Sequence, residues 1–282
     1  MNACSTRCKR SVALTRGDGR KCITVFTTEE RDGLRADLLQ AAQADPRITG
    51  AAITGSTSIG NEDRWSDVDL AFGVRQESEV QATLADFSER MYRTYHVLHH
   101  VDVLSGRWIY RVFLLPSTLQ VDLAFAPAPY FGARAPTFRL VFGTAAEQPP
   151  ISTTSAEELI GYAWLYALHV RSSIARGKLW QAEYMLGEMR NQVLALACVQ
   201  RDLPAREGRG IDSLPKEVTT PFQDALVRSL DADELLRAFR VVTNGFVREM
   251  RGFDQAFNIR LEPTLHSLTE VATLPNPSPK PD

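Results

Sequence analysis

The chain of 282 residues contains only four cysteines, and three of them (Cys4, Cys8 and Cys22) lie close to the N-terminus. A framework of disulfide bonds is therefore excluded for the body of the protein, and a reducing compartment suits it. No stretch approaches the roughly 18 consecutive apolar residues that a membrane-spanning helix needs; the longest dense apolar run covers residues 162–170. We therefore expect a cytoplasmic protein that has no membrane partner.

The chain also lacks a surplus of positive charge. Its 32 lysines and arginines face 34 acidic residues, which gives a formal net charge of -2. Proteins that bind nucleic acid by neutralising its phosphates are usually basic, so we expect no nucleic-acid partner. Only five of the 32 basic residues are lysines, so codon usage explains the many arginines better than phosphate recognition does.

The composition and patterning of the chain predict an ordered body between two tails. Residues 1–27 form a basic, acid-poor leader that we expect to be disordered, and the proline-rich residues 263–282 form a tail. Between them, residues 28–150 alternate predicted helices with short predicted strands. Helices are predicted at 28–44 and 77–95, and strands at 48–54, 67–74, 97–104, 108–115 and 119–125.

From Ser155 the apolar period changes from two to 3.6 residues, which predicts an all-α bundle over 151–262. The capping box Ser155-x-x-Glu158 begins a helix that Gly177 ends. Further helices are predicted over 179–201, from Pro221 in a first-turn position, and over 231–257. The last of these carries an apolar stripe for the bundle core: Leu235, Phe239, Val242, Phe246 and Met250. The predicted fold class is therefore α+β, a small mixed sheet followed by a helical bundle domain.

Two acids on one predicted strand carry the chemical signal. Successive side chains of a strand alternate between its faces, so Asp67 and Asp69 point to one side while Val68, Leu70 and Phe72 point into the core. Carboxylates this close repel each other unless a cation lies between them. Their hard oxygen ligands favour Mg²⁺ or Mn²⁺, so a metal site is predicted here.

Upstream of these acids, the strand at 48–54 runs into a loop that begins with Gly55 and Ser56. The backbone N–H groups and hydroxyls of such a loop suit a phosphate chain. A third carboxylate would complete the metal site or deprotonate an attacking hydroxyl, and two strand acids are candidates, Asp122 and Asp102. We favour Asp122 because apolar residues flank its strand on both sides, so an acid there requires a reason.

The linked pattern of Gly-Ser, Asp-x-Asp on a strand and a later strand Asp resembles the nucleotidyltransferase superfamily, which has a DNA polymerase β-like palm. A palm followed by an all-helical half is similar to the antibiotic nucleotidyltransferases, which adenylylate aminoglycosides or lincosamides. The resemblance covers about residues 45–255. Its catalytic motif maps onto Gly55, Ser56, Asp67, Asp69 and Asp122, whereas the likeness of the helical half is only architectural.

The resemblance implies transfer of AMP from ATP, a nucleoside triphosphate, to a hydroxyl of a small molecule, with release of pyrophosphate. Asp67, Asp69 and Asp122 would hold two Mg²⁺ ions, and Gly55 and Ser56 would bind the β and γ phosphates. Asp122 would either share the metal nearest the acceptor or take the proton from its hydroxyl. The sequence does not separate these two roles.

In the helical half, Lys178 is a candidate second contact for the triphosphate, as the family resemblance would allow. Glu183 and Tyr184 are candidates for an acceptor pocket, with a solvated helix face as the alternative. We expect the acceptor to bind between the two halves of the chain, and pairing of two chains is left open. The rival functions are nucleotidylation of a protein partner by an antitoxin-like enzyme and a palm that binds nucleotides without catalysis.

Overall fold

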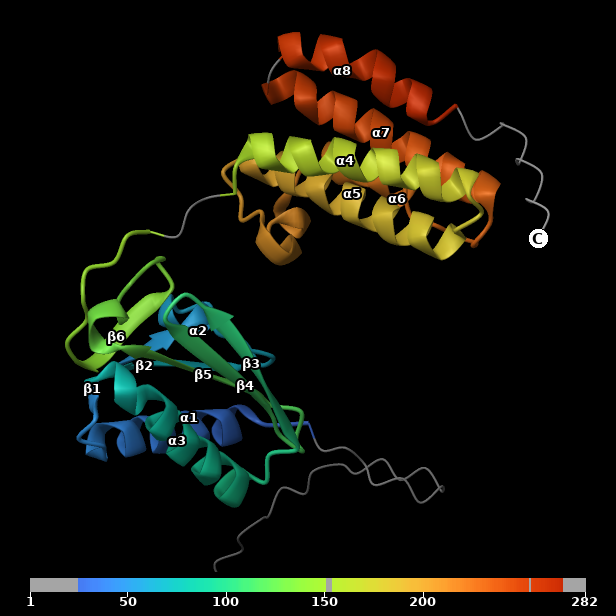
Figure 1. The fold of residues 1–282 in the computed structure, drawn as a ribbon. Coiled ribbons are helices and arrows are strands. Elements are labelled where there is room, and N and C mark those ends of the chain that lie inside the picture. The colour runs from blue at the N-terminus through green and yellow to red at the C-terminus, as the bar shows by residue number, and fades with distance from the viewer. Residues whose placement is uncertain (1–24, 151–153, 254, 271–282) are drawn as a thin grey trace, which may run out of the picture. The chain divides into compact units, whose positions relative to one another are not determined.

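A computed structural model describes residues 25–150, 154–253 and 255–270, with no side-chain detail for 254–258. The predicted leader up to residue 24 and the tail from residue 271 lie outside the described residues. The chain divides into two compact units, one that ends at Ile151 and one that begins at Ser152, and each unit is described by itself (Figure 1).

The first unit is built on a six-stranded mixed sheet with the order β3-β4-β5-β2-β1-β6. Its strands are β1 (Ile48–Thr54), β2 (Val68–Val74), β3 (His99–Ser105), β4 (Trp108–Leu114), β5 (Gln120–Pro127) and β6 (Phe138–Gly143). The neighbours β2 and β5 run parallel, and all other pairs are antiparallel. Strands β1 to β5 confirm the five strands that were predicted from the sequence. Strand β6 was not predicted, because it is a mostly exposed edge strand that forms by pairing with the distant β1.

Helices α1 (Thr28–Ala44) and α3 (Val80–Tyr95) lie on one face of this sheet (Figure 1). The hydroxyl of Thr27 accepts a 3.1 Å hydrogen bond from the amide of Glu30 and so caps α1. A short 3₁₀ turn, η1 (Glu77–Glu79), precedes α3. The large apolar side chains of both helices pack against those of the central strands: Leu34, Leu38, Leu84, Phe87 and Met91 against Leu70, Phe72, Leu123 and Phe125.

Phe26 extends this core beyond the start of α1. Its side chain is only 5% exposed, and its amide donates a 2.9 Å hydrogen bond to the carbonyl of Ser117. The predicted leader includes Phe26, but the burial of its ring makes this residue part of the folded unit. The opposite face of the sheet holds a smaller cluster in which alanines surround two rings: Ala52, Ala71, Ala124 and Ala126 with Trp108 and Phe131. On this face, the central strands β1, β2 and β5 therefore contribute alanines to the cluster.

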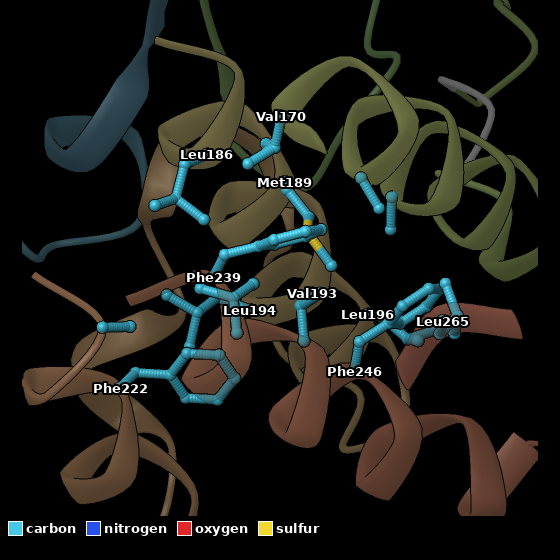
Figure 2. Packing of buried hydrophobic residues seen from close by; sticks show 14 of the residues in the cluster. Val170, Leu186, Met189, Val193, Leu194, Leu196, Phe222, Phe239, Phe246 and Leu265 are labelled. Carbon is cyan, nitrogen blue, oxygen red and sulfur yellow. The ribbon is translucent and has the colours of Figure 1, made fainter. Parts of the chain in front are cut away.

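The second unit is a helical bundle. Its α-helices within the described residues are α4 (Ala156–Ala175), α5 (Leu179–Val199), α6 (Lys216–Gln223), α7 (Ala232–Phe253) and α8 (Gln255–Leu268). The predicted apolar stripe of α7 is buried throughout, and Figure 2 shows Phe239 and Phe246 in one cluster with Met189 and Val193 of α5. None of the helices in the described part of the chain is long and apolar enough to cross a membrane.

Three boundaries in this unit were predicted wrongly. The helix predicted over 231–257 ends at Phe253, and the separate helix α8 begins at Gln255. Helix α6 begins at Lys216, so Pro221 lies inside it rather than in its first turn. Val218 and Phe222, one turn apart, are both buried, and their packing outweighs the preference of proline for a helix start. The chain also remains helical past residue 263, where we expected a tail. Leu265 and Leu268 of α8 are 2% and 5% exposed, so the last turns are held by the core.

Candidate active site

Three predicted acids meet at one end of the sheet. Asp69 on β2 and Asp122 on β5 are direct neighbours across the parallel pair, and Asp67 immediately precedes β2. Ligand oxygens of Asp67, Asp69 and Asp122 all lie within 4.8 Å of one another. The residues between them, Val68 and Val121, are fully buried on the face covered by the helices. The strand alternation therefore directs the three carboxylates to the opposite face of the sheet, which also carries Ala71 and Ala124.

Burial sets the electrostatics of Asp122. Removal from water raises the pKa of its carboxyl group to about 6, a hydrogen bond from Gln120 lowers this pKa, and the charge of Asp67 raises it. The carboxylate form of Asp122 is thus costly in the protein alone. A cation at this position would remove that cost, because it would stabilise the charged form.

Gly55 brings the backbone directly against the acids. It opens the single-turn helix α2 (Gly55–Ser58), which follows β1, and its φ is +64°. A Cβ atom on this residue would lie only 1.9 Å from Oδ2 of Asp69. Both the left-handed backbone and the close approach therefore require glycine here. Ser56 follows within the same turn, with its hydroxyl 3.3 Å from that of Ser66.

The loop between the Gly-Ser turn and the acids is held by helix α1. Arg31 is 3% exposed, and its Nη1 donates hydrogen bonds to the carbonyls of Asp63 (2.5 Å) and Ser66 (3.4 Å). Its Nε lies 3.1 Å from Oε1 of Glu62, which also accepts a 3.0 Å hydrogen bond from Thr57. Our sequence analysis missed Arg31 and Glu62. A signal existed, because a charged Arg31 shares the apolar face of α1 with Leu34, Leu38 and Ala42.

Gln120 is a third site residue that was not predicted from the sequence. Its Nε2 lies 3.0 Å from Oδ1 of Asp122 and 3.3 Å from Oδ2 of Asp67. The available signal was its position two residues before Asp122, which puts both side chains on the same face of β5.

The alternative third acid, Asp102, does not join the cluster. It lies on β3 opposite Arg111 of β4, whose Nε and Nη2 each donate a 2.6 Å hydrogen bond to its carboxylate. These hydrogen bonds from Arg111 lower the pKa of Asp102. Arg111 also donates a 2.7 Å hydrogen bond to Ser88 of α3, so this pair lies on the helix-covered face. An ion pair between neighbouring strands explains Asp102.

The remaining predicted site residues belong to the second unit. Lys178 is the exposed N-cap residue of α5, Glu183 is half-buried and Tyr184 is 63% exposed. A cavity of about 300 Å³ in this unit is lined by side chains of α4, α5 and the turn near residue 206, among them Glu158, Tyr162, Tyr166, Gln192 and Arg206. Lys178, Glu183 and Tyr184 do not line it.

The donor set of the acid cluster fits a divalent cation. Three carboxylates supply hard oxygen ligands, which suit Mg²⁺ or Mn²⁺ better than softer metals. The backbone of Gly55 lies directly against the carboxylate of Asp69, since a Cβ on residue 55 would clash with Oδ2 of Asp69. The arrangement could therefore bind a metal and an anionic group next to it.

Comparisons with known proteins show only a distant structural similarity. No family model matches the sequence, and a search of curated proteins finds no significant match. Among solved structures, the chain is similar to an aminoglycoside 6-adenyltransferase from Bacillus subtilis, with 12% sequence identity and a TM-score of 0.39. The similarity covers 86% of this chain and 99% of that one. At this level the comparison assigns no activity, which has to be argued from the residues of the site.

Proposed function

We propose that the protein is a nucleotidyltransferase of the adenylyltransferase type, which transfers AMP from ATP to a hydroxyl of a small molecule and releases pyrophosphate. The observation that carries the proposal is the cluster of Asp67, Asp69 and Asp122 beside the backbone of Gly55. Acids on neighbouring strands that face one another repel each other, and a cation between them would remove this repulsion. The adjacent backbone offers a place for the phosphates that such a metal would accompany.

The three acids would hold Mg²⁺, and the resemblance to the nucleotidyltransferases implies two ions. When bound, Mg²⁺ supplies stabilisation of the charge that develops on the attacking and leaving oxygens. The chain's own contribution is to keep the three carboxylates together through the paired register of β2 and β5. Arg31 and Glu62 contribute by fixing the loop that leads into Asp67.

Asp122 is suited to receive the proton of the acceptor hydroxyl. General bases work best when their pKa lies near the working pH, and burial raises the pKa of Asp122 to about 6. The alternative role, as a ligand of the metal nearest the acceptor, uses the same carboxylate. Gly55 and Ser56 would orient the β and γ phosphates through backbone N–H groups and the serine hydroxyl.

In the helical unit, we propose Lys178 as a further contact of the triphosphate and Glu183 and Tyr184 as acceptor contacts. The acceptor class is an aminoglycoside- or lincosamide-like antibiotic or a metabolite with a comparable hydroxyl. Homodimer formation and a location in the cytoplasm belong to the same proposal.

The test is pyrophosphate release with Mg²⁺ and each of the four ribonucleoside triphosphates, against a panel of aminoglycosides, lincosamides and metabolites. Release that depends on an acceptor and is lost in Asp69→Asn supports the proposal and names the substrate class. ATP binding without release against the whole panel would contradict it, and would favour a protein acceptor or a palm without catalysis.

A further inference from the structure

Gln120 lies between two of the acids and donates to both. Its Nε2 is 3.0 Å from Oδ1 of Asp122 and 3.3 Å from Oδ2 of Asp67. A primary amide carries two N–H donors on this nitrogen, and an ionised carboxylate is only an acceptor. The opposite orientation of the amide would place its oxygen against two carboxylates, which is repulsive. The chemistry of the neighbours therefore fixes the amide nitrogen between the two acids.

The backbone explains why this side chain can reach both acids. Gln120 and Asp122 are two residues apart on β5 and so share a face. The parallel register pairs Val68 with Val121, which puts Asp67 beside Gln120 on the adjacent strand. Leu119, directly before Gln120, is fully buried, and its carbonyl accepts a 3.0 Å hydrogen bond from the amide of Leu115. The start of β5 is therefore held at both its side chain and its backbone.

We propose that Gln120 is a positioning residue for the metal, which keeps Asp67 and Asp122 at the spacing that a divalent cation needs. The inference rests on the metal site of the proposed function. Gln120 uses Oδ1 of Asp122 and Oδ2 of Asp67, so one oxygen of each carboxylate is left to the cation. Without the bridge, the two negative charges repel and the carboxylates rotate apart. Binding the metal then has to bring them back together, which weakens its affinity.

The experiment is calorimetric titration of the full chain with Mn²⁺ in the absence of nucleotide. Gln120→Met keeps the length of the side chain and removes the amide. Side chains that hydrogen-bond to metal ligands typically contribute about 10- to 100-fold in metal affinity, so we expect Mn²⁺ to bind about 10- to 100-fold more weakly to this variant. Gln81→Met is the matched control, because Gln81 is also an exposed glutamine but lies on α3, on the other face of the sheet. It should bind Mn²⁺ like the wild type.

Thermal unfolding without metal separates positioning from folding. Gln120 is exposed, so Gln120→Met should unfold within a few degrees of the wild type. Wild-type Mn²⁺ affinity in folded Gln120→Met would overturn the inference while leaving the metal site intact. If the wild type bound Mn²⁺ no better than Asp69→Asn, the metal site of the proposed function would fail, and the role of Gln120 with it.

Discussion

The two faces of the six-stranded sheet use their charged residues in opposite ways. On the face covered by α1 and α3, Asp102 lies opposite Arg111 and each satisfies the other, with Ser88 completing the network. On the other face, Asp67, Asp69 and Asp122 lie next to one another, and the pKa of Asp122 is raised to about 6. One sheet therefore carries an acid placed for stability and a cluster of acids that folding alone does not explain.

The difference shows how a function can be inferred from electrostatic cost. A charge that is paired within the fold lowers the energy of the native state, whereas adjacent like charges raise it. The second arrangement suits a site at which a bound cation compensates for this cost. The two faces also differ in packing, because the covered face has a large core of phenylalanines and leucines, while the acid-bearing face has a small cluster of alanines with Trp108 and Phe131.

Among the changes that test this difference between the two faces, Asp69→Asn is expected to have the largest effect on activity. Removing the charge of the central acid should reduce nucleotidyl transfer to background, a loss of at least about 1,000-fold, because the metal loses a ligand. The measurement is pyrophosphate release, with circular dichroism to show that the variant is folded. A folded variant with the wild-type rate would rule out a metal site at this cluster.

Asp122→Asn and Asp102→Asn compare the two faces directly. The first should lower the turnover rate at least about 100-fold, the scale of general acid–base catalysis, with little loss of stability. The second should keep its activity and lose about 1 kcal/mol or less of unfolding free energy, because Asp102 is partly exposed to solvent. Rates and urea unfolding of both variants check this, and the reverse order would move the site to β3.

Gly55→Ala tests the close approach at the acid-bearing face, with Gly60→Ala as its control. Both glycines have positive φ values, +64° and +75°, so either alanine should cost about 1–2 kcal/mol of stability. Only the Cβ of the first would strike Asp69, since nothing lies within 4 Å of the second. We therefore expect a loss of about 100-fold in rate for Gly55→Ala alone. Equal rates in the two variants would show that the contact does not matter.

The smallest expected effect is the pH dependence of metal binding. A metal binds the ionised carboxylate, and burial raises the pKa of Asp122 to about 6. Protons therefore compete with the metal as the pH falls through about 6, so Mn²⁺ affinity should be about tenfold lower at about pH 5 than at about pH 7. Titration calorimetry at several pH values measures this. Asp122→Asn should flatten the dependence, and an unchanged slope in that variant would assign the proton to another group.

Much of the first unit was predictable because its strands carry their pattern locally. Strands β1, β2 and β5 have buried apolar runs, and the spacing of Asp67 and Asp69 alone indicates a shared face. Strand β6 was not predictable in this way, because four of its six residues are exposed and its position depends on β1. Helix α2 is a single turn, too short for any periodicity to be seen.

The site residues that were predicted differ in type from their neighbours in the sequence, such as an acid on an apolar strand or a glycine directly after a strand. Gly55 and Asp122 stand out in this way, and the structure places both at the acid cluster. Arg31 and Gln120 were missed because their roles depend on which segments meet across the sheet. A single sequence contains no direct record of these contacts. It does show that Arg31 lies on an apolar helix face and that Gln120 shares a face with Asp122.

The parallel pairing of β2 and β5 has a consequence for the order in which the site is assembled. Antiparallel neighbours such as β4 and β5 need only a tight turn, but the parallel pair of β2 and β5 has to wait for the intervening α3, β3 and β4. Contacts between segments distant along the chain form slowly, so Asp67 and Asp69 emerge during synthesis well before Asp122 can join them. We therefore expect a growing chain to acquire its affinity for metal abruptly, when β5 docks onto β2, rather than residue by residue.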